Sequence, residues 1–184
     1  MIVFFTILNK DIVDTKVLFL DRDGVINKDI GYCNKIHDFQ FIDGIFDVCK
    51  YAKLNGFEII IVTNQSGIGR GFYSHEDFKR LNKWMLTQFG KKSVKILDTY
   101  YCPHKPEDYC TCRKPLPGLI LKAQKEHSID LKNSWLIGDK ETDIKAAIAA
   151  GIVNNILFTV NKENLQTEAK VVISSLHKFK EISL

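Results

Sequence analysis

The sequence of 184 residues lacks any apolar run approaching the ~20 residues that a membrane-spanning helix requires. It also lacks an arginine-rich run with interleaved aromatic residues, and its basic residues are scattered. We therefore expect neither a membrane nor nucleic acid as a partner; the net charge of +4 suits a small anionic substrate better. Internal repeats and low-complexity segments are absent too.

With 45% hydrophobic residues, the chain can build one full core, so we expect a single soluble domain over residues 1–184 that acts as a monomer. Residues 1–8 are apolar but lack the basic leader and small-residue cleavage site of a signal peptide. We interpret them as an extra strand or an extended arm. A cytoplasmic protein is expected.

The chain is organised around residues 16–27, K-V-L-F-L-D-R-D-G-V-I-N. Residues 17–20 are uniformly apolar, which is typical of a strand buried on both faces of a parallel sheet. Asp21 and Asp23 follow directly, and Gly24 then allows a sharp turn. Two acids at the end of a buried strand destabilise a fold unless a metal, hydrogen bonds or a ligand neutralises them. An ordinary turn explains this pattern alone about equally well.

The two acids have the chemistry of a phosphatase. Asp21 would attack phosphorus to form an aspartyl-phosphate, while Asp23 would protonate the leaving alcohol and later deprotonate the attacking water. Both steps need a hard cation, and Mg²⁺ prefers carboxylates, waters and substrate phosphate as its ligands.

Short apolar segments alternate with amphipathic ones along the rest of the chain. Strands are predicted at residues 57–62, 94–101, 135–137, 156–160 and 171–173. Helices are predicted at residues 43–55, 74–89, 117–127, 143–150 and from 174 onward, and Ser74 with Asp77 is expected to form a capping box for the second. The alternation predicts a doubly wound, Rossmann-like α/β fold whose mostly parallel sheet has helices on both faces.

Polar side chains follow the apolar strands at Asp21, Asp23, Thr63 and Asp139, and the ends of parallel strands meet at one rim of a sheet. The Thr63 hydroxyl and the Asn64 amide would bind phosphate oxygens there, and Lys114 would add a positive charge. Asp139 offers a third carboxylate to the metal. Strand-end capping explains Thr63 alone, and a solvated lysine explains Lys114 alone.

Asp143 lies one helical turn beyond Asp139 and would brace the metal site, although helix capping accounts for it nearly as well.

Four motifs in this order resemble the haloacid dehalogenase (HAD) superfamily of aspartate-nucleophile phosphatases. They are D-R-D-G-V-I-N, V-T-N-Q-S-G-I, C-R-K-P-L-P-G and I-G-D-K-E-T-D. Within that superfamily they are most similar to the heptose-bisphosphate phosphatases, which serve heptose nucleotide synthesis for bacterial surface polysaccharides. The resemblance runs from about residue 17 to 151. The short distances between motifs leave no room for a large cap domain.

The resemblance implies a phosphoric monoester hydrolase with Asp21 as nucleophile and Asp23 as general acid and base. It assigns Mg²⁺ to Asp21, Asp139 and the main-chain carbonyl of Asp23. Thr63 and Lys114 would steady the phosphoryl group of a sugar phosphate. The implied substrate-binding residues are Asp29, Ile30, Gly31, Tyr32, Thr63, Asn64, Gln65, Ser66, Arg113, Lys114 and Lys140.

Three of the five cysteines cluster near a histidine, whereas Cys33 and Cys49 stand alone. The cluster comprises Cys102, His104, Cys110 and Cys112, a Cys₃His set suited to a structural Zn²⁺. Disulfide pairing is the alternative, but cytosolic thiols stay reduced. The zinc would hold the loop that leads into Arg113.

Two other functions stay open. The short segment between His104 and Cys110 matches histidinol-phosphate phosphatases of the same superfamily better. Ser66, Lys140 and the G-I-G-R-G run instead resemble the heptose enzymes. A catalytically silent, zinc-stabilised binding module is the second alternative, although the chain keeps every residue that the chemistry requires.

Overall fold

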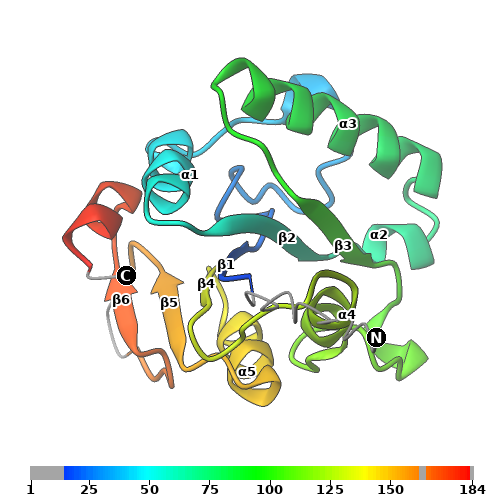
Figure 1. Cartoon of the computed structure of the whole chain (residues 1–184). Helices are drawn as coiled ribbons and strands as arrows, with labels where there is room; N and C mark the ends of the chain where they lie inside the picture. The colour runs from blue at the N-terminus through cyan, green and yellow to red at the C-terminus, as the bar shows by residue number, and fades with distance from the viewer. Residues whose placement is uncertain (1–14, 162–164, 183–184) are drawn as a thin grey trace, which may run out of the picture.

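The computed structural model describes residues 15–161 and 165–182 (Figure 1). Residues 1–8, interpreted above as a strand or an arm, lie outside this part. Six parallel strands form one sheet in the order β3-β2-β1-β4-β5-β6. They are β1 (Val17–Leu20), β2 (Glu58–Asn64), β3 (Asp98–Cys102), β4 (Trp135–Gly138), β5 (Asn154–Phe158) and β6 (Val171–Ile173).

Helices cover both faces of the sheet (Figure 1). On one face lie α1 (Ile45–Leu54), α3 (His75–Lys91) and the 3₁₀ helix η3 (Leu176–Glu181). On the other face lie α4 (Gly118–His127) and α5 (Glu141–Ala150). The short helices are η1 (Ile36–Asp38), α2 (Ser66–Gly69) and η2 (Pro106–Asp108). The predicted doubly wound α/β fold without a large cap is confirmed; that the whole chain forms one domain stays a prediction.

Strand β1 lies inside the sheet and is buried on both sides, as its sequence predicts. Leu18 and Leu20 pack with α1 and α3, whereas Val17 and Phe19 pack with α4 and α5, because successive side chains of a strand point to opposite faces. Strands β2 and β4 flank β1, and the chain reverses its direction of winding between them. Open α/β sheets bind ligands at such a switch point, beyond the carboxyl ends of the strands.

Several predicted boundaries shift. Thr63 and Asn64 are the last residues of β2 rather than the first beyond it. Strand β3 begins at Asp98 instead of 94, because the preceding apolar residues follow the turn after α3, where the Val94 N–H donates to Phe89 O at 3.0 Å. Strand β5 ends before Val160, which is 81% exposed.

At the helices, α5 begins at Glu141, two residues earlier than predicted, and the predicted closing helix is the 3₁₀ helix η3. The predicted capping box is confirmed at the start of α3, where Ser74 and Asp77 exchange hydrogen bonds. Among the described residues, no helix is both long and apolar enough to cross a membrane.

Gly24 turns the chain immediately after the two acids with a φ of +92°, a conformation that other residues rarely adopt. A Cβ atom at this position would collide with the carboxyl group of Asp139. The absent side chain therefore lets the loop after β1 approach the end of β4.

We expect Gly24→Ala to destabilise the protein by at least ~1 kcal/mol more than Gly71→Ala, because only Gly24 adds a collision to the backbone strain. Gly71 also has a positive φ, of +73°, but a Cβ atom there would face open space, which makes it the matched control. Urea unfolding of both variants measures the difference. Equal losses would show that the contact with Asp139 carries no energetic weight.

Candidate active site

A cleft of about 420 Å³ lies at the carboxyl ends of β1 and β2. Its walls include most of the residues that the sequence predicts. Those at or after strand ends are Asp21, Asp23, Thr63, Asn64, Gln65 and Ser66. Those from other loops are Asp29, Gly31, Tyr32, Arg113, Lys114 and Lys140. Ile30 does not line the cleft and is 56% exposed.

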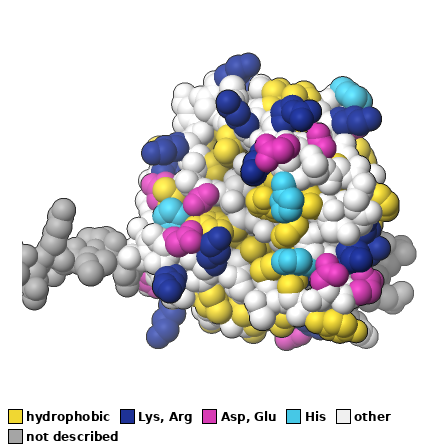
Figure 2. Space-filling model, turned by 90° about the vertical axis from the view of Figure 1, so that its right-hand side faces the viewer, with side chains coloured by type: hydrophobic (Ala, Val, Ile, Leu, Met, Phe, Trp, Pro, Cys, Tyr) yellow, Lys and Arg dark blue, Asp and Glu magenta, His cyan; other side chains and the backbone are white. Residues whose placement is uncertain are grey.

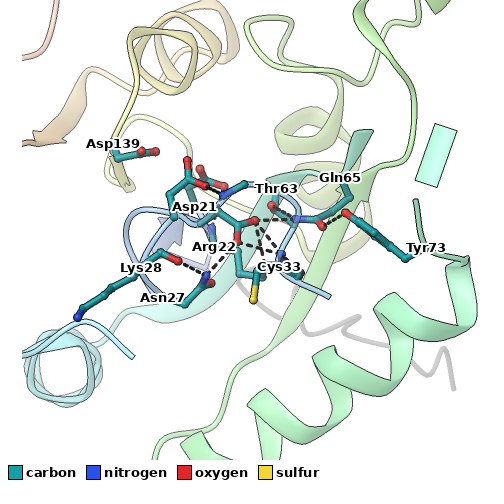
Figure 3. Close-up of polar contacts among 12 residues, drawn as sticks. Asp21, Arg22, Asn27, Lys28, Cys33, Thr63, Gln65, Tyr73 and Asp139 are labelled. Atoms are coloured by element: carbon teal, nitrogen blue, oxygen red, sulfur yellow. Dashed lines mark hydrogen bonds and ion pairs between the residues drawn. The ribbon is translucent and has the colours of Figure 1, made fainter. Parts of the chain in front are cut away.

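Asp21 follows β1, and its N–H donates to Ile137 O of β4 at 3.0 Å. Its Oδ1 accepts from the Arg22 N–H at 2.7 Å and from Lys114 Nζ at 2.9 Å. Oδ2 forms no hydrogen bond within the described part of the chain, so it is the oxygen that remains for a ligand. Figure 3 shows Asp21 beside the polar network of the cleft.

The Lys114 ammonium is almost fully buried and contacts three oxygens. Besides Asp21, it binds Asp143 Oδ1 at 2.5 Å and donates to Val62 O at 2.9 Å. Burial alone would lower the pKa of Lys114, but the carboxylates of Asp143 and Asp21 outweigh it and raise that pKa. Lys114 therefore stays charged in the interior.

Three carboxylates lie close together near this cation: Asp21 and Asp143 contact Lys114, whereas Asp139 Oδ2 lies 3.6 Å from Lys140 Nζ. Oxygens of Asp21, Asp139 and Asp143 all lie within 4.8 Å of one another. Burial, reinforced by Asp143 and Asp139, raises the pKa of Asp21 to about 7 although Lys114 opposes it. Burial likewise raises the pKa of Asp139 to about 6. Besides Lys114, the nearby cation is Lys140, which Asp139 shares with Asp29, so among the described residues the carboxylates outnumber the cations that pair with them and a divalent cation is favoured.

Asp143 caps a helix, as its sequence position allows, and also contacts Lys114; its predicted support of a metal site stays a prediction. Its Oδ2 accepts from the Lys140 N–H at 3.0 Å and caps α5, while Oδ1 binds Lys114. A Cβ atom on Gly138 would collide with the Asp143 side chain, so this approach also requires glycine.

The Asp23 carboxylate accepts hydrogen bonds from three side chains, those of Arg22, Asn27 and Gln65. Arg22 reaches both of its oxygens, Asn27 Nδ2 donates to Oδ1 at 2.9 Å, and Gln65 Nε2 donates to Oδ2 at 2.9 Å. Its side chain remains 18% exposed and lines the cleft. Asp23 is thus held in place while it faces a ligand.

Gln65 is 2% exposed, so its amide acts on neighbouring side chains. Oε1 accepts from the Tyr73 hydroxyl at 2.7 Å, and Nε2 donates to Thr63 Oγ1 at 2.8 Å as well as to Asp23. Because Thr63 Oγ1 accepts from Gln65, its own proton is available to an oxygen in the cleft.

Asn64 ties β2 to the loop that carries Lys114. Its Nδ2 donates to Lys114 O at 3.1 Å, and its Oδ1 accepts from the Lys114 N–H at 3.1 Å. Both ends of the amide are therefore engaged by the backbone. Asn64 positions Lys114, in addition to lining the cleft.

The loop after β1 reaches across to α5 through an ion pair. Lys140 Nζ lies 2.7 Å from Asp29 Oδ2, and the Gly31 N–H donates to Asp29 Oδ1 at 2.9 Å. Although burial opposes it, these contacts lower the pKa of Asp29. Tyr32 meets Phe72 edge to face, with ring centroids 4.7 Å apart. The rim of the cleft thus combines charged and aromatic groups.

The four predicted zinc ligands lie together. Sγ of Cys102 is 3.6 Å from Nδ1 of His104 and 3.5 Å from Sγ of Cys110, and Cys112 Sγ lies 3.3 Å from the same Nδ1 and 3.5 Å from Cys110 Sγ. Sulfur–sulfur distances in a disulfide are ~2.0 Å, so all three thiols are free. Ligands at ~2.3 Å around tetrahedral zinc lie ~3.7 Å apart, which agrees with the observed spacing.

This cluster leads directly into the cleft. Arg113 Nη1 donates to His104 O at 3.3 Å, and both Arg113 and Lys114 line the cleft. On the far side, a Cβ atom on Gly118 would collide with Thr111 O, so α4 packs closely against the loop. The loop that carries these two cations of the cleft thus begins directly after the cluster.

Four residues of the site escaped the sequence analysis: Arg22, Asn27, Tyr73 and Thr142. An arginine directly between two acids is a usable signal for the first, because a charged residue next to a buried strand requires partners. Tyr73 gives no local signal, since it contributes through a contact with Gln65 that only the fold creates.

The chain is similar to HAD-like hydrolases and to heptose-bisphosphate phosphatases. The family model described as HAD-hydrolase-like matches residues 111–175. D-glycero-beta-D-manno-heptose-1,7-bisphosphate 7-phosphatase of Helicobacter pylori (strain J99) is 48% identical over 82% of this chain and 87% of the relative. The D-glycero-alpha-D-manno-heptose-1,7-bisphosphate 7-phosphatase of Campylobacter jejuni is 50% identical over 81% of this chain and 84% of the relative.

A solved structure agrees with these relatives. The D,D-heptose 1,7-bisphosphate phosphatase of B. bronchiseptica, in complex with magnesium and phosphate, superposes with a TM-score of 0.81 at 27% identity and covers 91% of this chain and 97% of that one. By its fold, its cleft and these identities, the chain belongs to the heptose-1,7-bisphosphate 7-phosphatase family of HAD-like hydrolases.

Proposed function

We propose that this protein is a magnesium-dependent phosphatase that removes the 7-phosphate of D-glycero-D-manno-heptose 1,7-bisphosphate, as a step toward nucleotide-activated heptose for surface polysaccharide. The observation that carries the proposal is that relatives of 48–50% identity bear this name and that the cleft holds the acids such a reaction needs. Of the two alternatives, neither of these relatives is a histidinol-phosphate phosphatase, and a silent binding module would not need an intact pair of acids.

In the first step, Asp21 Oδ2 attacks the phosphorus of the 7-phosphate. The bond from phosphorus to the sugar oxygen breaks, and Asp23 gives that oxygen a proton. In the second step, Asp23 takes a proton from water as the water oxygen attacks phosphorus, and the bond to Asp21 breaks. Phosphate is released and both acids return to their starting state.

Lys114 and Thr63 stabilise the charge that the phosphoryl group carries during transfer. The Lys114 ammonium lies 2.9 Å from Asp21 and would act on phosphate oxygens as a point charge. The free proton of the Thr63 hydroxyl would donate to another oxygen. Both groups are buried and already oriented, so little reorganisation accompanies the reaction.

The residues present fit Mg²⁺. Asp139 Oδ1 is buried without a hydrogen-bond partner among the described residues, and an oxygen of Asp21 lies within 4.8 Å of the Asp139 ligand oxygen. Asp21, Asp139 and the Asp23 carbonyl would hold the ion. When bound, it neutralises the carboxylates and draws charge from the phosphoryl oxygens.

We assign a structural Zn²⁺ to Cys102, His104, Cys110 and Cys112. Four protein ligands close a tetrahedral shell and leave no position for water, so this metal has no part in the chemistry. Its role is to fix the loop with Arg113 and Lys114. A cytoplasmic location and a monomeric state stay predictions.

Replacing Cys110 by serine should lower zinc content from about one per chain to well below half, because a four-ligand site loses affinity with each ligand. Activity should fall with it, since Arg113 and Lys114 lose their support. Elemental analysis of reduced protein and phosphate release measure the two effects.

The matched control is Cys49→Ser, which changes a buried thiol on α1 outside the cluster and should keep its zinc. Full zinc content in the Cys110 variant, or full activity without zinc, would contradict the assignment.

Arg113 is proposed to recognise the second phosphate of the bisphosphate. It lines the cleft beside Lys114, and a guanidinium binds a phosphate through two parallel hydrogen bonds. Arg113→Ala should therefore lower kcat/KM for heptose 1,7-bisphosphate by ~10–100-fold, as expected for a lost charged hydrogen bond. Heptose 7-phosphate, which has the same reacting group, should lose much less.

Arg80→Ala, on the exposed side of α3, is the control and should leave both substrates unaffected. With the wild-type protein, the same assay should favour one heptose 1,7-bisphosphate anomer over histidinol phosphate and fructose 1,6-bisphosphate. Equal losses on both heptose substrates would assign Arg113 to the reaction centre, and a preference for histidinol phosphate would overturn the proposed function.

A further inference from the structure

Arg22 lies between the two catalytic acids in the sequence and is only 1% exposed. Its guanidinium faces Asp23: Nε donates to Oδ2 at 3.1 Å, and Nη2 donates to Oδ1 at 3.0 Å. Nη2 also donates to Cys33 O at 2.8 Å. The side chain is thus a two-pronged clamp on one carboxylate, with an additional bond to the loop beyond it.

Packing alone does not account for an arginine here. Its Nη1 is buried and has no hydrogen-bond partner among the described residues, which is unfavourable for a charged group. The Phe78 ring lies 5.8 Å from the guanidinium carbon and supports its face without satisfying that donor. The contact with Asp23 therefore explains why an arginine occupies this buried position.

The other donors to Asp23 cannot replace this clamp. Asn27 and Gln65 are neutral, and each donates to only one oxygen. Of these three described donors, only Arg22 contacts both oxygens, which fixes the plane of the carboxylate as well as its position. A general acid must lie within hydrogen-bond reach of the leaving oxygen, and small misplacements cost large factors in rate.

The bond to Cys33 O connects this clamp to the substrate-binding loop. Asp29, Gly31 and Tyr32 of that loop line the cleft, and Cys33 follows them directly. The guanidinium therefore holds the proton-transfer group and the end of the loop in one arrangement.

We propose that Arg22 is a positioning residue for the reaction, which aligns Asp23 with the leaving oxygen and ties it to the loop over the cleft. The inference rests on the proposed function only for the role of Asp23 as proton donor. Lysine keeps the charge but cannot form the fork, so Arg22→Lys isolates the geometry of the clamp.

Arg22→Lys should lower kcat/KM for heptose 1,7-bisphosphate by ~10–100-fold, because misalignment impairs protonation of the sugar oxygen. With p-nitrophenyl phosphate the loss should stay below ~3-fold, since nitrophenolate leaves without full protonation. In an Asp23→Asn background, Arg22→Lys should cause no further loss, because the contact acts through Asp23. The control is Arg80→Lys, an exposed arginine whose ion pair with Asp77 lies outside the cleft.

Equal losses on both phosphate esters, or a full further loss in the Asp23→Asn background, would overturn the proposal, because a general loss of folded protein produces those results. If Arg22→Lys does not fold, Phe78→Leu is used instead, because it removes the ring beneath the guanidinium. The same two substrates are then compared with that variant. If the wild type does not hydrolyse the heptose bisphosphate, only the proposed function fails. Glycerol phosphate then replaces the heptose bisphosphate as the substrate with a poor leaving group.

Discussion

The close approach of three carboxylates beside the buried Lys114 ammonium is the constraint on which the rest of the site depends. Asp21 and Asp143 contact Lys114, Asp139 lies beside them, and burial raises the pKa of Asp21 and of Asp139. Two glycines make room for this approach. Gly24 lies against Asp139, and Gly138 lies against Asp143. This concentration of negative charge favours a divalent cation at the end of β1, where Asp21 lies.

The supports of the site lie in three different parts of the fold. The ends of the parallel strands bring the acids together. Lys114 follows the Cys102 to Cys112 loop, which begins at the end of β3, on the side of β2 away from β1. Arg22 holds Asp23 against the loop over the cleft. The face drawn in Figure 2 mixes basic, acidic and apolar side chains and is not uniformly charged.

Sequence reasoning predicts the features that depend on local pattern and on the convergence of parallel strand ends. It places Asp21, Thr63 and Asp139 on one rim and the cysteines in one cluster, and the structure brings these together. It misplaces the start of β3, because apolar residues that pack against the core resemble residues that pair in a sheet. It misses the contacts of Arg22 and Tyr73, which exist only after distant segments meet.

Trapping the covalent intermediate tests the account most directly. A single turnover with substrate radiolabelled in the 7-phosphate would be quenched in acid, and the labelled peptide would be mapped. We expect the label on the peptide containing Asp21 and none on protein that carries Asp21→Asn. Phosphate release with no labelled peptide at any time, or label retained in the Asp21→Asn variant, would contradict the account.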